Sequence, residues 1–82
     1  MPYVPQERRR ELNNGGEIET MGDMNYVLTS IVFDWLNRRP ENYDNYNGVI
    51  GVLESMKLEL YRRTVAPYED LKVAQNGDVF SE

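Results

Sequence analysis

The sequence contains no cysteine and no histidine. Without cysteine the chain can form neither a disulfide nor a thiolate metal site, which fits an intracellular protein. Without histidine it lacks the commonest metal ligand and the one side chain that ordinarily titrates near neutral pH. Any catalysis would therefore use carboxylates, lysine, arginine or tyrosine, and nucleophiles activated by histidine are excluded.

Long apolar runs are also missing. No run approaches the roughly 20 residues that cross a bilayer, and the opening MPYVPQERRR lacks the apolar core of a signal peptide. We therefore expect a cytoplasmic protein that has no membrane partner.

The chain is short and acidic. Its 82 residues make one small domain with a net charge of −5. A chain of this length buries only about 60–65% of its unfolded surface, so we expect a homo-oligomer rather than a lone monomer. The acidic total disfavours nucleic acid as the main ligand.

The clearest pattern is a helical repeat over residues 46–61, YNGVIGVLESMKLELY. Apolar residues recur there at spacings of three and four, which places them on one face of a helix. They are Tyr46, Val49, Ile50, Leu53, Met56, Leu60 and Tyr61. A second stripe holds the small residues Gly48, Gly51 and Ser55.

Capping and breaking residues predict the remaining elements. Residues 1–22 hold a short helix over about 5–13, which Asn13-Asn14-Gly15-Gly16 ends, and a loop. A second helix over 23–39 is capped by Asp23. The central helix covers 44–66 and is capped by Asp44 or Asn45, and a short C-terminal helix covers 67–76. Residues 77–82 form a tail, in which Val79 and Phe80 are candidates to anchor back onto the bundle. The fold class is therefore all-α: an antiparallel helical hairpin with short flanking helices at both ends, forming a small helical bundle.

Four residues are predicted to pack helices together. Phe33 lies off the main apolar stripe of the second helix, so it either rests on a loop of the same chain or meets another subunit. Gly48, Gly51 and Ser55 allow close approach of a helix, which is either the second helix of this chain or one from a partner. Glycine in a helix costs roughly 0.5–1 kcal/mol, so each should have a structural reason.

Paired arginines are candidate anion-binding groups. Arg62 and Arg63 fall at the predicted end of the central helix, just before Pro67 could start another. The alternative is that they pair with Glu59, Glu69 or Asp70 at a solvated helix end. A second basic cluster, Arg8 to Arg10, is expected to be solvated.

Carboxylates offer little for a metal. Small all-helical nucleotide pyrophosphatases bind magnesium through acidic groups three residues apart on adjacent helices. Here Glu41 and Asp44 have that spacing but lie in a connection, and Glu54 and Glu59 do not share a face. We therefore predict no metal site, no cofactor and no catalytic residue, and keep a magnesium-dependent hydrolase as a weak alternative.

Three segments carry a family resemblance: MPYV, GDMNYVLT and GVLESMKLELYRRTVAPYEDLKVAQNGDV. The sequence resembles a family of small uncharacterised proteins of phages and prokaryotes, most strongly in YRRTVAPYED followed by NGDV. The resemblance implies a phage-borne protein in the host cytoplasm. It points to one candidate binding segment: Arg62, Arg63, Pro67, Tyr68, Glu69 and Asp70. The same segment could instead be a structural helix–kink–helix corner.

The sequence thus favours a non-enzymatic, oligomeric interaction protein of the anti-defence kind, which binds or blocks a host factor. The alternative is a binder that sequesters a small anionic, nucleotide-like ligand at arginine-lined subunit boundaries.

Overall fold

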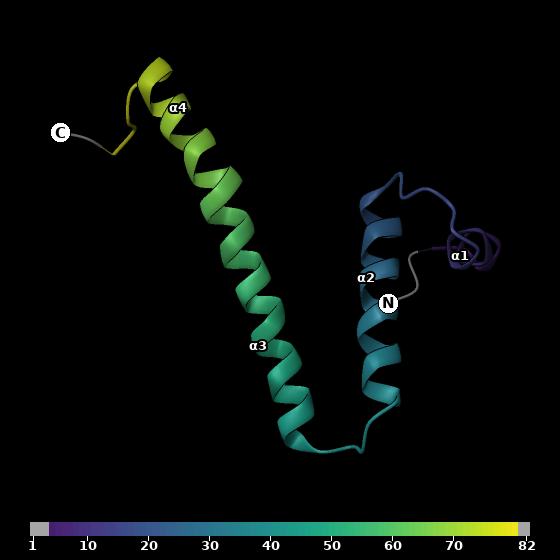
Figure 1. Ribbon diagram of the computed structural model, residues 1–82. Coiled ribbons are helices and arrows are strands. Elements are labelled where there is room, and N and C mark those ends of the chain that lie inside the picture. The colour runs from purple at the N-terminus through teal and green to yellow at the C-terminus, as the bar shows by residue number, and fades with distance from the viewer. Residues whose placement is uncertain (1–3, 81–82) are drawn as a thin grey trace. The chain divides into compact units, whose positions relative to one another are not determined.

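The computed structural model describes residues 4–80, and every regular element in that range is helical. The elements are α1 (Gln6–Asn13), α2 (Met21–Asn37), α3 (Tyr43–Leu60), the π-helical turn η1 (Tyr61–Val65) and α4 (Ala66–Asn76) (Figure 1). The predicted all-α class is confirmed. The chain divides into two units, Met1–Tyr46 and Asn47–Glu82, and the antiparallel hairpin that would join them stays a prediction.

The first unit contains the small core of the described chain. Val4 and Leu12 are the buried apolar side chains, at 5% and 7% exposed, and α1 packs against α2. Gly15 has a φ of +88°, the left-handed conformation that glycine adopts without strain, and it ends α1 as predicted.

Helix α2 begins two residues before the predicted start, so Asp23 is not its N-cap. Thr20 takes that role, and its Oγ1 accepts a hydrogen bond from the backbone N–H of Asp23 at 2.9 Å. Both residues are good cap types, and the structure uses the upstream hydroxyl because the Asp23 carboxylate is engaged elsewhere. The predicted C-terminal end at residue 39 is also two residues late, since α2 ends at Asn37.

Helix α3 also starts earlier than predicted, and neither Asp44 nor Asn45 caps it. The Asn42 side chain accepts a hydrogen bond from the backbone N–H of Asn45 at 2.8 Å, which places the cap before Tyr43. The Asn45 side chain instead donates to the Pro40 carbonyl at 2.9 Å.

The helix does not end at Pro67. Helix α3 passes into η1 and then into α4 without a break, and Pro67 lies in the first turn of α4 (Figure 1). In η1 the N–H of Ala66 reaches back five residues to the carbonyl of Tyr61. A proline inside a regular α-helix clashes with the carbonyl four residues earlier. The wider π-turn just before Pro67 changes the backbone spacing there, so the helix continues through the proline.

The C-terminal end of α4 agrees with the prediction, but the tail does not anchor back. Gly77 has a φ of +81° and its N–H bonds to the Val73 carbonyl at 2.8 Å. The expectation that Val79 and Phe80 pack onto the bundle is wrong for the described structure, where they are 86% and 92% exposed.

Candidate functional site

The predicted binding segment lies around η1, on one continuous helix. Arg62 and Arg63 both bond to the Glu59 carboxylate, at 3.3 and 2.5 Å to the same Oε1 atom. Hydrogen bonds from the two guanidinium groups lower the pKa of Glu59, with Arg63 contributing the larger effect. The arginine pair is therefore used, at least in part, as a salt bridge along the helix surface.

A second contact bridges the π-turn. The Tyr61 hydroxyl donates to Glu69 Oε1 at 2.5 Å, joining residues eight apart in the sequence. The hydrogen bond to Glu69, and then its charge, raise the pKa of Tyr61. Residues eight apart are brought to one side by the helical repeat, so this bond connects η1 with the first turn of α4.

The remaining predicted residues are near this bridge and exposed. Lys72 Nζ lies 5.4 Å from the centroid of the Tyr68 ring, within the range of a cation–π contact. Pro67 supplies backbone geometry, and the Asp70 carboxylate adds a charge that helps to raise the pKa of Tyr61. The six predicted residues thus lie on one continuous helical segment and project from several of its sides.

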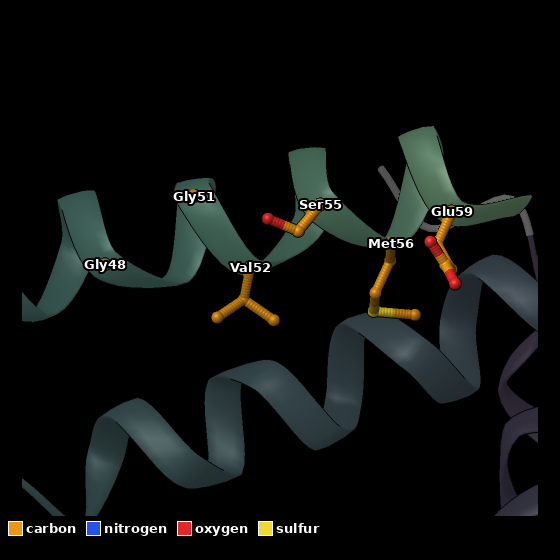
Figure 2. A pocket seen from close by; sticks show the side chains of 6 residues that line it. All are labelled: Gly48, Gly51, Val52, Ser55, Met56 and Glu59. Atoms are coloured by element: carbon orange, nitrogen blue, oxygen red, sulfur yellow. The ribbon is translucent and has the colours of Figure 1, made fainter. Parts of the chain in front are cut away.

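The predicted small-residue stripe lines an open depression on α3. Gly48, Gly51 and Ser55 lie there with Val52, Met56 and Glu59, and Figure 2 shows bare backbone at the two glycines beside projecting side chains. A Cβ built on Gly48 or Gly51 meets nothing within 4 Å. Phe33 belongs to the other unit, on α2, and is 57% exposed.

Sequence reasoning missed the most engaged polar group in the described chain. Asp23 is only 3% exposed, and its carboxylate accepts two bonds from Arg8, at 2.6 and 3.3 Å. Asp23 Oδ2 also accepts the backbone N–H of Glu19 at 3.0 Å, while Arg8 donates to the Glu17 carbonyl at 2.7 Å. The Thr-x-x-Asp spacing of Thr20 and Asp23 was the available signal.

These contacts set the charge state of Asp23. Hydrogen bonds lower the pKa of Asp23 to about 2. The bond from Arg8 has the largest effect, and the bond from the backbone N–H of Glu19 has the next largest. The expected solvation of the Arg8–Arg10 cluster is therefore wrong for Arg8, which ties α1 to the start of α2. A buried carboxylate paired with a guanidinium in this way holds the two helices together.

The described residues contain no group of three or more carboxylates placed to hold a metal ion. Within the same range, no helix has both the length and the apolar character of a membrane span.

Comparison with known proteins places the chain in a family. The model of a domain of unknown function, DUF6899, matches residues 1–79. The chain belongs to the DUF6899 family. The expected membership of an uncharacterised family is thus confirmed, and the DUF6899 match includes all six residues of the predicted binding segment. No curated protein and no solved structure matches the chain.

Proposed function

We propose that the protein is a non-enzymatic interaction protein that works by docking its helices against another protein chain. One observation carries the proposal. In the described chain, Val4 and Leu12 are the buried apolar residues, while large apolar side chains along α2, α3 and α4 stay exposed. Exposed apolar surface on this scale marks a protein-binding face.

The size of the chain supports the same conclusion. Small domains commonly gain stability from a disulfide, a metal or association. The sequence has no cysteine, and residues 4–80 offer no cluster of metal ligands. Of these three sources of stability, association with another chain is the one that the proposal adopts.

The nucleotide-sequestering alternative finds less support. Its candidate groups, Arg62 and Arg63, both bond to Glu59, which places a carboxylate where an anionic ligand would bind. A phage origin and a host-factor target remain proposals that rest on the family resemblance.

Native mass spectrometry of tagged protein purified from host cells tests the proposal. We expect a multimer or a complex with a retained protein. A folded monomer of 9.6 kDa that carries no other protein would contradict it. A retained ligand of a few hundred daltons, lost in the double variant Arg62→Ala, Arg63→Ala, would instead favour the sequestering function.

A further inference from the structure

The apolar residues of α3 follow a coiled-coil repeat. Tyr46, Val49, Leu53, Met56 and Leu60 follow one another at spacings of three, four, three and four residues. This mean period of 3.5 residues is the pattern of helices that pair along their length.

An unbroken repeat would fail immediately after α3. The next positions of the pattern are 63, 67 and 70, which are Arg63, Pro67 and Asp70. None of these suits an apolar contact between two helices.

The π-turn corrects the register. A π-turn holds one residue more than the α-helical stretch it replaces, as the five-residue bond from Ala66 to Tyr61 shows. Each later position of the repeat therefore moves one residue along the chain. The pattern then falls on Thr64, Tyr68 and Leu71, two of which are large and apolar.

The result is one apolar line on both sides of η1. We define the apolar seam as Val49, Leu53, Met56, Leu60, Tyr68 and Leu71. From Leu53 onward its members are 41–62% exposed, and Val49 is partly exposed.

The other helices of the chain are too short to cover this seam. Helix α2 has 17 residues, about 25 Å at 1.5 Å per residue. The seam spans residues 49–71, roughly 33 Å by the same rise. Part of it would stay uncovered even in the predicted hairpin.

We propose that the apolar seam pairs with the same seam of a second copy of this chain, and that η1 keeps its two halves on one face. This names the partner for the proposed function, on which it rests. An apolar seam of this kind is covered along its full length by a helix with the same repeat and the same π-turn, and a second copy of the chain supplies one.

The available area is sufficient for a dimer. The seam is flanked by Ile50 and Val65, which are 64% and 39% exposed. At roughly 80 Å² for each half-exposed apolar side chain, the pair of helices buries on the order of 1,200 Å² in total, the lower bound of a stable interface.

Two leucines form a matched test. Leu60 lies on the seam and Leu58 lies about 200° away around the helix, yet they are 62% and 59% exposed. We expect Leu60→Glu to weaken self-association at least about tenfold, because it places a charge in the apolar contact. Leu58→Glu should leave association unchanged. Sedimentation equilibrium over a range of concentrations measures both.

A second pair tests the register beyond η1. Leu71 is on the seam and Val73 is not, at 54% and 45% exposed. Leu71→Glu should weaken association and Val73→Glu should not. If the glutamate variants are insoluble, Leu60→Ala and Leu58→Ala repeat the comparison with a milder change.

The outcomes separate this inference from the proposed function. A dimer weakened equally by Leu60→Glu and Leu58→Glu would overturn the seam but keep the interaction protein. A wild-type monomer that retains a different protein would also overturn the seam and keep the proposed interaction function. A wild-type monomer with no retained protein would overturn both.

Discussion

At the scale of single residues, Asp23 is the most consequential polar side chain of the described structure. It joins α1, the loop that follows and α2 through Arg8, Glu19 and Thr20. Removing one member of a buried charge pair leaves the other without compensation, which is far more harmful than losing an exposed pair.

We therefore expect Asp23→Asn to lower the Tm by at least about 5 °C at pH 7, followed by circular dichroism. Asp34→Asn is the matched control, because Asp34 pairs with Arg38 at 3.3 Å with both side chains well exposed. Exposed pairs of this type contribute about 0–1 kcal/mol. Equal losses in the two variants would show that the buried pair has no special role.

The same carboxylate predicts a pH dependence. Its pKa is about 2 in the folded chain and 3.8 ordinarily. Between these values the unfolded chain binds more protons, so stability falls as pH drops from 3.8 toward 2. Asp23→Asn should flatten the dependence of Tm on pH in that window, and an unchanged slope would contradict the assignment.

Tyr61 offers a local probe of the π-turn. Its bond to Glu69 raises the pKa of the phenol above its ordinary value of 10. Glu69→Gln removes the charge and should bring that pKa down toward 10, measured by NMR titration of the Tyr61 ring. Glu7→Gln, the same change at an exposed carboxylate of α1, should leave the Tyr61 titration unchanged.

At the scale of the elements, the cap of α2 makes the clearest prediction. Thr20→Ala removes the hydroxyl that accepts the Asp23 N–H and should destabilise the protein by about 1 kcal/mol. Thr20→Ser keeps an oxygen at the same place and should retain most of the stability. Chemical denaturation of the two variants beside wild type measures the difference, and a stable alanine variant would rule out the cap.

How far the elements could be predicted depends on the kind of signal. The two long helices were predictable, because their apolar residues recur at helical spacing over many turns. The starts of α2 and α3 were not, since Thr20, Asp23, Asn42 and Asp44 are all acceptable caps and the choice depends on contacts between elements.

The candidate site was predictable as a segment but not in its contacts. The arginine pair and the acidic residues near Pro67 are visible in the sequence, and their pairing with Glu59 was among the alternatives. The Arg8–Asp23 tie joins residues 15 apart and arises only when α1 packs on α2. The π-turn was missed because a proline that ends a helix and a proline that follows a π-turn look the same in sequence.

At the scale of the whole molecule, the exposed apolar surface predicts a stability that depends on concentration. If folding and self-association are coupled, the Tm belongs to the complex and falls on dilution. We expect a tenfold dilution of a dimer to lower the Tm by roughly 3–6 °C. A Tm that is independent of concentration would show that the monomer is stable without a partner.

The π-turn also makes one position of the long helix tolerant of a change in length. Deleting the codon for Pro67 removes both the helix breaker and the additional residue, so Tyr68 would follow Leu60 by seven positions in a regular helix and stay on its face. Deleting the codon for Leu58 would rotate everything beyond it by about 100°. In a scan of single-codon deletions, we therefore expect variants with a deletion near η1 to stay folded and variants with a deletion in α3 before η1 to lose stability. Natural differences in chain length should then occur mainly at this turn.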